Sequence, residues 1–512
     1  MTVHASEDRP ATAQDTTSLP LIVDLDGTLL RTDTLFECIA ENMRTRPVWT
    51  LIQMALLPFS IAKIKARLQG GCDIDVTTLP VNEDVAGYCR EAKAAGRTVW
   101  LVSAADQDTV QRIADQFGFF DRAIGSDGVT NNKGSNKAKL LQQAFPEGFE
   151  YVGDSPADMK VWKAAKAASL VGGGEARKAA VEREGVTVAR TFERKEFSLK
   201  AWRKAMRMHQ WAKNSLIFVA PILALEIMNP DALIRCLIAF PLIGMVASGT
   251  YFINDLLDLK ADRVHHSKYK RPFASGAIKL WQGFVAAPLM IVAGIAGGAL
   301  LSPPFALTMI MYLVITLSYS LALKRMPLLD TMVLGFLYTL RLIMGGVLVS
   351  VPVTQWLVVF SMFLFVSLSL AKRHVEVARK AAAGERKIAN RGYKAEDAPL
   401  TLGLGLATAT ASPIILVLYL MDSAWPSGVY MSPSALWAAP IVLSLWLMRV
   451  WMLANRVELD DDPVTFAVKD KYSIALGGVL GIAFLLAVVG SPVSLSWLGL
   501  QTPPQVLPAV VP

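Results

Sequence analysis

Three aspartates recur at a helical spacing directly after a long apolar run, residues 240–253. Asp255, Asp258 and Asp262 stand at positions i, i+3 and i+7, so a helix would present their carboxylates on one face. Cations follow at once: Arg263, Lys268, Lys270 and Arg271. Carboxylates are the hard oxygen ligands that Mg²⁺ prefers, and Mg²⁺ together with Lys and Arg binds phosphate groups. Because charges beside a bilayer are costly, the pattern predicts a diphosphate site instead of an ordinary charged loop.

A second pair of acids ends an apolar run near the N-terminus. Asp24 and Asp26 alternate after residues 21–23 and are followed by Gly27 and Thr28. Alternation sends the two carboxylates to related positions at the carboxyl end of a strand, where open α/β sheets bind their ligands. On its own, a pair of alternating acids is weak evidence for a site.

Three later elements repeat this placement of a polar residue at a strand end or helix start. An apolar run ends at Ser103, Lys137 opens a predicted helix, and a further apolar run ends at Asp154, with Asp158 close behind. This ordered set closely resembles the haloacid dehalogenase (HAD) superfamily of phosphatases over residues 21–173. The resemblance implies an α/β, Rossmann-like domain.

The resemblance also implies roles for these side chains. Asp24 would be the nucleophile that forms an aspartyl-phosphate, and Asp26 would protonate the leaving oxygen and then activate water. Ser103 and Lys137 would hold the phosphoryl oxygens, with Lys133 as a rival to Lys137. The implied ligands of one Mg²⁺ ion are Asp24, Asp26, Asp154 and Asp158. A fold of this type without activity is the alternative, although none of the expected side chains is missing.

The residues inserted after this first motif lie where the superfamily carries a small helical cap. The insertion covers residues 34–69, and we place the cap at about 34–80. Its apolar segment 49–61 is short, contains Pro58 and continues into basic residues. We therefore expect it to pack against protein or to lie on a membrane surface, and not to span a bilayer.

The composition divides the chain into two parts. With 512 residues of which 53% are hydrophobic, the chain is too apolar for a soluble protein, whereas its first ~200 residues are too polar for a membrane protein. From Trp211 onward, stretches near membrane-spanning length recur, and about nine spans are predicted. They lie near 212–229, 233–253, 282–302, 305–323, 328–350, 354–371, 400–421, 433–454 and 473–490. The predicted parts are a polar tail (1–20), a HAD-like domain (21–190), a basic linker (191–210), an all-α membrane domain (211–490) and a final tail (491–512).

Basic residues fall in every second loop between these spans. They lie in the loops 260–271, 324–325, 372–394 and 456–471. By the positive-inside rule these loops and the N-terminal domain face the cytoplasm, so the protein would be a multi-pass protein of the cytoplasmic membrane with its C-terminus outside. The polar N-terminus has no apolar segment typical of a signal peptide, which agrees with a cytosolic first domain. The net charge of +8 therefore favours a lipid bilayer as partner and not nucleic acid.

Cysteines and histidines contribute little to the predicted chemistry. Cys38, Cys72, Cys89 and Cys236 show no metal-binding spacing, and we interpret them as reduced thiols without disulfides. His265 and His266 are interpreted as a solvated pair in a loop, with metal binding as the alternative.

The aspartate pattern with a following Arg-Pro resembles the UbiA superfamily of intramembrane prenyltransferases over residues 211–490. Members that act on aromatic acceptors usually carry a second aspartate-rich motif, where this protein instead has Ala-Lys-Arg-His-Val-Glu at 371–376. Together with residues 207–214, 271–276 and 319–324, this resembles one branch, the decaprenyl-phosphate phosphoribosyltransferases. The departure from the second motif counts against a prenyl diphosphate donor.

That branch implies transfer of 5-phosphoribose from phosphoribosyl diphosphate to a polyprenyl phosphate. Asp255 and Asp258 would be catalytic, and one or two Mg²⁺ ions would be held by Asp255, Asp258, Asp262 and Glu376. Asn254 would assist in binding the diphosphate. The candidate phosphate-binding cations are Lys213, Lys268, Arg271, Lys324, Arg341, Lys372 and Arg373. Among these, Arg341 interrupts an apolar run, so it should face a polar cavity.

The reactions predicted for the two domains could follow one another on the same lipid. The membrane domain would make a lipid that keeps a 5-phosphate monoester, and the HAD domain would remove that phosphate to give polyprenyl-phosphoryl-ribose for cell-envelope glycan synthesis. One alternative is a prenyltransferase with a prenyl diphosphate, an aromatic or isoprenoid acceptor and an independent phosphatase. Another is a membrane-anchored protein that only binds these ligands. The sequence leaves lipid chain length and homo-oligomer formation open.

Overall fold

The computed structural model describes residues 18–56, 67–70, 72, 74–126, 132–194, 197–384, 391–459 and 463–490. The predicted tail 491–512 and most of the predicted tail 1–20 therefore lie outside the described residues. The chain divides into two compact units. The first unit contains residues 1–206 and 251–287, and the second contains 207–250 and 288–512.

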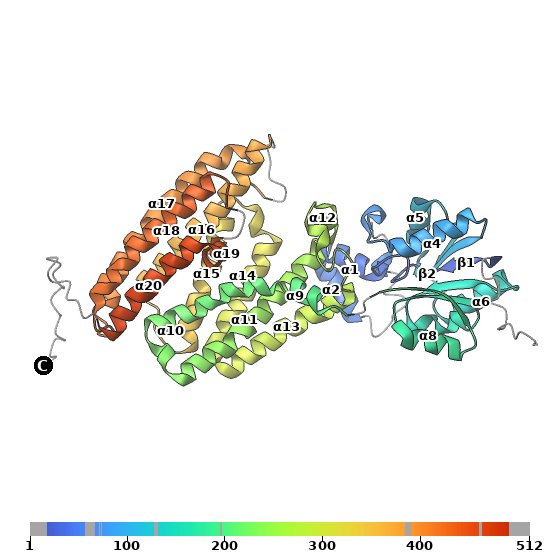
Figure 1. The fold of residues 1–512 in the computed structure, drawn as a ribbon, viewed down its shortest axis with the longest axis horizontal. Helices are drawn as coiled ribbons and strands as arrows, with labels where there is room; N and C mark the ends of the chain where they lie inside the picture. The colour runs from blue at the N-terminus through green and yellow to red at the C-terminus, as the bar shows by residue number, and fades with distance from the viewer. Residues whose placement is uncertain are drawn as a thin grey trace, which may run out of the picture. The chain divides into compact units, whose positions relative to one another are not determined.

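A six-stranded sheet forms the centre of the first unit (Figure 1). Its strands are β1 (Leu21–Val23), β2 (Val99–Asp106), β3 (Arg122–Ser126), β4 (Glu150–Gly153), β5 (Ala167–Val171) and β6 (Thr187–Phe192). All neighbouring strands are parallel, in the order β3-β2-β1-β4-β5-β6. The strand order reverses between β1 and β4, and such a switch point is where open α/β sheets bind ligands. The predicted α/β class is confirmed.

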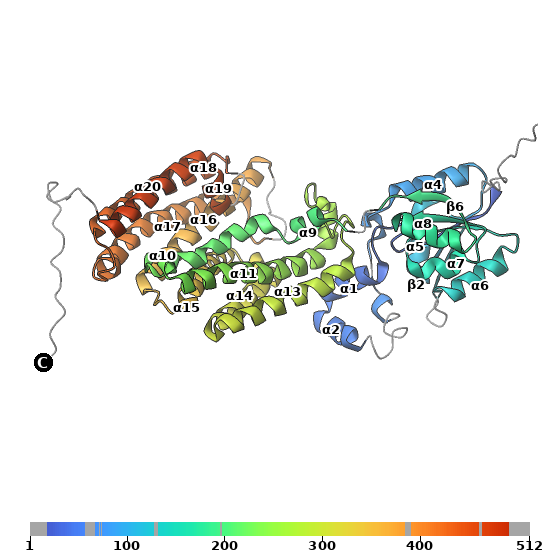
Figure 2. The same cartoon turned by 60° about the horizontal axis from the view of Figure 1, so that its bottom comes forward.

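Helices cover both faces of this sheet because alternate strand residues point in opposite directions. Leu21 and Val23 pack with α4 (Glu83–Ala94) and α5 (Gln107–Phe117), whereas Ile22 packs in a separate core. That second core contains α6 (Ser135–Ala144), α7 (Met159–Trp162) and α8 (Gly174–Arg183), and Figure 2 gives another view of these helices. Both faces of β1 are therefore buried, as its continuous apolar sequence requires.

Two helices follow β1 in the region predicted as a cap. Asp33 caps α1 (Thr34–Thr45), since its carboxylate accepts hydrogen bonds from the backbone N–H groups of Leu35 and Phe36. The next helix, α2 (Pro47–Leu56), has ten residues and is too short to span a bilayer. A 3-10 turn, η3 (Val76–Thr78), precedes α4. The rest of the predicted apolar segment, residues 57–61, lies outside the described residues.

The described residues that follow α9 (Leu199–Ala205) are largely helical. Eight helices among them are long and apolar enough to cross a membrane. They include α11 (Pro230–Leu257), α13 (Leu280–Leu301), α14 (Pro303–Leu321), α15 (Leu329–Leu348) and α16 (Gln355–Ala382); the other three contain α17 (Ala398–Tyr419), α18 (Ala438–Asn455) and α20 (Lys471–Val489). Short elements between the eight helices are α12 (Leu259–Val264), η7 (Lys268–Lys270), η8 (Leu323–Arg325) and α19 (Pro463–Lys469). Three further short elements form ends of the helices that contain α17 and α18: η9 (Ala395–Asp397), η10 (Leu420–Ala424) and η11 (Pro433–Trp437).

The predicted first span, 212–229, is not one continuous helix. It is divided into η5 (Met208–Phe218), α10 (Val219–Leu223) and η6 (Glu226–Met228), and Leu225 has a left-handed φ of 58°. Pro221 lies within α10, and the polar residues Lys213 and Asn214 interrupt the apolar pattern in η5. The eight long helices therefore correspond to the other eight predicted spans.

Candidate active sites

Acids from two adjacent strands meet at the switch point of the sheet. Asp24 follows β1, Asp154 follows β4, and Asp158 lies one turn further on. One carboxylate oxygen from each of these three residues lies within 4.8 Å of the others. Three convergent carboxylate oxygens are the donor set that Mg²⁺ prefers, so the residues fit a magnesium site.

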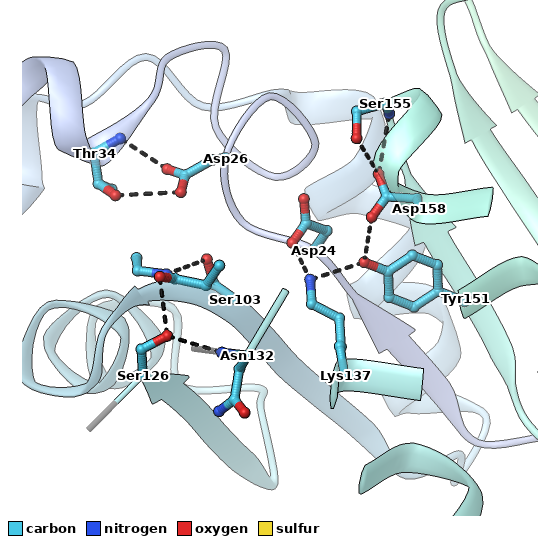
Figure 3. Close-up of polar contacts among 12 residues, drawn as sticks. Asp24, Asp26, Thr34, Ser103, Ser126, Asn132, Lys137, Tyr151, Ser155 and Asp158 are labelled. Atoms are coloured by element: carbon cyan, nitrogen blue, oxygen red, sulfur yellow. Dashed lines mark hydrogen bonds and ion pairs between the residues drawn. The ribbon is translucent and has the colours of Figure 1, made fainter. Parts of the chain in front are cut away.

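Lys137 touches the predicted nucleophile. Its Nζ lies 2.6 Å from Oδ1 of Asp24 and donates to the hydroxyl of Tyr151 at 2.9 Å (Figure 3). The Tyr151 hydroxyl in turn donates to Oδ1 of Asp158 at 3.0 Å. The Lys137 side chain is only 4% exposed, whereas its predicted rival Lys133 is an exposed residue. The geometry therefore favours Lys137, and it adds Tyr151, whose role we did not predict from the sequence.

Asp26 lies apart from the group of three acids. Its carboxylate accepts hydrogen bonds from the backbone N–H of Thr34 at 2.8 Å and from the Thr34 hydroxyl at 3.3 Å (Figure 3). These contacts fix Asp26 against the start of α1. Asp26 still lines the same pocket as Asp24.

The pocket around these residues has a volume of about 360 Å³. Ser103 lies in its wall and is 1% exposed; its Oγ accepts a hydrogen bond from the backbone N–H of Ala105 at 3.1 Å. Burial raises the pKa of Asp24 to about 7, although the neighbouring Lys137 ammonium opposes that shift. Burial likewise raises the pKa of Asp154, opposed mainly by Lys279. Closely spaced, desolvated carboxyls of this kind favour binding of a divalent cation.

Arg271 joins two of the aspartates that follow the apolar run. Its Nη1 lies 3.0 Å from Oδ1 of Asp255 and 2.6 Å from Oδ2 of Asp262, and the two carboxylates are 3% and 2% exposed. Burial raises the pKa of Asp262, and Arg271 opposes that shift. The predicted helix is interrupted at Asp258, which separates α11 from α12, yet the backbone N–H groups of Asp258 and Asp262 still donate to the carbonyls four residues earlier. Two of the three carboxylates therefore lie together, with a cation between them.

The second unit contains a buried ionic cluster around Asp330, which is fully buried. Nη2 of Arg373 lies 2.9 Å from Oδ2 of Asp330 in an ion pair, and Arg373 also pairs with Glu376. The hydroxyl of Tyr393 donates to Oδ1 of Asp330 at 2.7 Å, and Arg391 lies 3.6 Å from both acids. The predicted residue Arg373 thus contacts both the predicted residue Glu376 and an acid that the sequence interpretation missed. A lone Asp at the start of an apolar run was the available signal.

Arg341 lies in a polar environment inside the second unit, as its position in a predicted span requires. It is 6% exposed and donates to Oδ1 of Asn214, to the carbonyl of Leu337 and to the hydroxyl of Tyr312, at 2.7–3.1 Å. Lys213 lies 5.5 Å from the ring centre of Tyr338, which Arg341 also approaches. Among the described residues, the buried Nδ2 of Asn214 has no hydrogen-bond partner. A buried donor of this kind suits a ligand oxygen.

Residues 215–473 match the UbiA prenyltransferase family, which is half of the chain. The chain belongs to this family. Residues 21–163 match the haloacid dehalogenase-like hydrolases, so a hydrolase-type domain precedes the UbiA domain. The UbiA assignment and the apolar helices make this a multi-pass membrane protein with a transferase-type and a phosphatase-type domain.

Three relatives are similar to different shares of this UbiA-family protein. An uncharacterized protein of Sinorhizobium fredii, y4nM, is 41% identical over 92% of this chain and 91% of its own length. A decaprenyl-phosphate phosphoribosyltransferase of Mycobacterium tuberculosis is 33% identical, over 36% of this chain and 63% of the relative. The nodulation protein NoeC of Azorhizobium caulinodans is 32% identical, over 55% of this chain and 92% of NoeC.

The other predicted site residues of the UbiA domain have less defined surroundings. Asn254 is half-buried near the end of α11, Lys268 is exposed in η7, and Lys324 and Lys372 are half-buried. His265 and His266 stack on each other with ring centres 4.3 Å apart. All four cysteines are free thiols; Cys38, Cys89 and Cys236 are buried, and Cys72 is half-buried.

Proposed function

We propose that the UbiA domain transfers 5-phosphoribose from phosphoribosyl diphosphate to a polyprenyl phosphate, and that the HAD domain then removes the 5-phosphate. The observation that carries the second step is the contact between Lys137 and Asp24 beside two further acids, since this set can bind and cleave a phosphomonoester. The first step is supported by the relative named decaprenyl-phosphate phosphoribosyltransferase. The product of the first step retains the monoester that the second step requires.

In the phosphatase site, a carboxylate oxygen of Asp24 attacks phosphorus, and the bond between phosphorus and the ribose oxygen breaks. Asp26, held by Thr34, gives its proton to the leaving ribose oxygen. Asp26 then takes a proton from the water that hydrolyses the aspartyl-phosphate, which releases inorganic phosphate. Lys137 and Ser103 bind the phosphoryl oxygens throughout.

In the transferase, an oxygen of the lipid phosphate attacks C1 of the ribose while the bond from C1 to the diphosphate breaks. Arg271 lies where it can bind the departing diphosphate, between Asp255 and Asp262. Mg²⁺ bound by the acids of either domain would supply positive charge that stabilises the phosphate oxygens. Asn214 and Arg341 are candidates for orienting a substrate oxygen within the second unit.

A contact within the first unit supports the proposed membrane topology. Arg263, just after α11, forms an ion pair with Glu37 of the N-terminal domain, so both lie on one side of a bilayer. With one crossing proposed for α11, which is long and apolar enough to span a bilayer, we propose that the preceding segment 207–229 crosses as well. At about 2.0 Å per residue for η5 and 1.5 Å for α10, it reaches roughly 30 Å. We therefore propose nine crossings, with the N-terminal domain in the cytoplasm and the C-terminus outside the cytoplasmic membrane.

The decisive experiment uses the purified full-length protein in detergent with Mg²⁺, decaprenyl phosphate and phosphoribosyl diphosphate labelled in the ribose. Wild type should give the ribosyl lipid, and Asp24→Asn should stop at the 5-phosphoribosyl lipid. Asp84→Asn, which changes an exposed acid in the same domain, should behave as wild type. If no lipid is labelled while a prenyl diphosphate is consumed with an aromatic acceptor, the prenyltransferase alternative replaces the proposal.

A further inference from the structure

The phosphatase pocket is completed by residues that open a membrane helix. Lys279, Leu280 and Trp281 line the same pocket as Asp24 and Ser103, and all of these residues belong to the first unit. Lys279 lies with its Nζ 3.7 Å from Oδ2 of Asp154. Leu280 is the first residue of α13, one of the eight candidate membrane helices among the described residues.

The segment that precedes α13 packs against the HAD domain. Arg263 donates from Nε to the carbonyl of Ala274 at 3.1 Å and pairs with Glu37 through two hydrogen bonds. Gly276 has a φ of +69°, and a Cβ at this position would lie 2.6 Å from the carbonyl oxygen of Arg31. Arg31 itself lines the pocket. The close approach of backbone at Gly276 therefore fixes the start of α13 beside the pocket.

Exposure distinguishes the inner end of the pocket from its mouth. As whole residues, Asp24, Ser103 and Lys137 are 8%, 1% and 3% exposed, so these phosphate-binding candidates lie at the inner end. Lys279 and Trp281 are 45% and 44% exposed, so they lie at the mouth. The volume of about 360 Å³ is near the lower end of small-molecule pockets, which leaves room for a sugar phosphate but not for a polyprenyl chain.

We propose that Lys279 and Trp281 make this phosphatase specific for phosphomonoesters carried on membrane lipids. Trp281 lies in the first turn of a membrane helix, where an amphipathic indole favours the interface between lipid and water. The sugar phosphate enters the pocket, the lipid tail stays in the bilayer along α13, and Lys279 attracts the phosphodiester that joins the two. The identity of the sugar rests on the proposed function, whereas the preference for a membrane-bound substrate does not.

The test measures kcat/KM of the full-length protein in lipid vesicles on two substrates. One is soluble ribose 5-phosphate, and the other is the 5-phosphoribosyl lipid that Asp24→Asn accumulates. Trp281→Ala should lower kcat/KM on the lipid about tenfold or more and leave the soluble substrate within about twofold. Trp281→Phe should retain most of the activity on the lipid. Val285→Ala changes an exposed residue of the same helix outside the pocket and should alter neither value.

Equal losses on both substrates, or no loss on the lipid with Trp281→Ala, would overturn the inference. Hydrolysis of phosphatidic acid in the same vesicles shows whether the lipid specificity or the proposed function is wrong. If wild type ignores the phosphoribosyl lipid but hydrolyses phosphatidic acid in a Trp281-dependent manner, only the sugar assignment is wrong. If phosphatidic acid and ribose 5-phosphate are hydrolysed equally well by wild type and Trp281→Ala, the lipid specificity is wrong.

Discussion

The carboxylate of Glu37 accepts two hydrogen bonds from the guanidinium of Arg263, at 3.0 and 2.6 Å. Glu37 belongs to α1 of the predicted cap, and Arg263 belongs to α12, directly after the aspartates of the UbiA motif. The two side chains are 5% and 6% exposed. A buried pair of this geometry ties α1 to the segment that carries Asp255, Asp258 and Asp262.

Removing one partner should destabilise the protein strongly, because the other charge stays buried. We expect Glu37→Ala to lower the free energy of unfolding by about 3–5 kcal/mol, and the double change Glu37→Leu with Arg263→Met to cost less. Denaturation of each variant in detergent, monitored by the remaining hydrolysis of ribose 5-phosphate, measures both changes in the free energy of unfolding. The exposed Glu41–Arg44 pair on the same helix is the control, and Glu41→Gln should cost no more than about 1 kcal/mol. Equal costs for the two helix positions would contradict this account.

Protons and Mg²⁺ should compete at the phosphatase site. Burial raises the pKa of Asp24 to about 7, so below this pH the free carboxyl holds a proton that Mg²⁺ must displace. The apparent Mg²⁺ affinity should therefore weaken by up to about tenfold per pH unit below 7 and level off above it. The Mg²⁺ concentration for half-maximal hydrolysis of ribose 5-phosphate, measured at about pH 6, 7 and 8, tests this predicted change in affinity. A constant value across this range would show that no buried proton is displaced.

Arg271 should affect the transferase alone. Its guanidinium contacts Asp255 and Asp262 through one nitrogen and retains further donors for a diphosphate, which a lysine at this position would not supply. Arg271→Lys should lower transfer of labelled ribose to lipid by about tenfold or more while hydrolysis of ribose 5-phosphate is unchanged. Lys260→Ala, which removes an exposed cation on α12, is the matched control. Loss of both activities in Arg271→Lys would indicate a structural role instead.

The site residues that could be predicted from the sequence are those that local spacing determines. Asp24 and Asp154 each follow an apolar strand, and the carboxyl ends of adjacent parallel strands meet at one edge of a sheet. Arg271 reaches Asp255 and Asp262 from the adjoining loop. By contrast, no spacing pairs Asp330 with Arg373 and Tyr393, because those residues come from separate segments that only tertiary packing brings together. For the same reason the placement of Trp281 in the phosphatase pocket could not be predicted.

Tyr393 should stabilise the second unit through two hydrogen bonds. Its hydroxyl donates to Oδ1 of Asp330 and accepts from the backbone N–H of Leu328, each at 2.7 Å, and the residue is 2% exposed. Tyr393→Phe leaves a buried carboxylate oxygen of Asp330 and the backbone N–H of Leu328 without this partner, so it should lower the free energy of unfolding by about 1–3 kcal/mol. Tyr472 is 68% exposed, and Tyr472→Phe should change the same quantity by less than about 0.5 kcal/mol. Thermal unfolding of the two variants in one detergent compares them directly. If Tyr393→Phe is as stable as Tyr472→Phe, water must replace the hydroxyl, and the Asp330 cluster is then open to solvent.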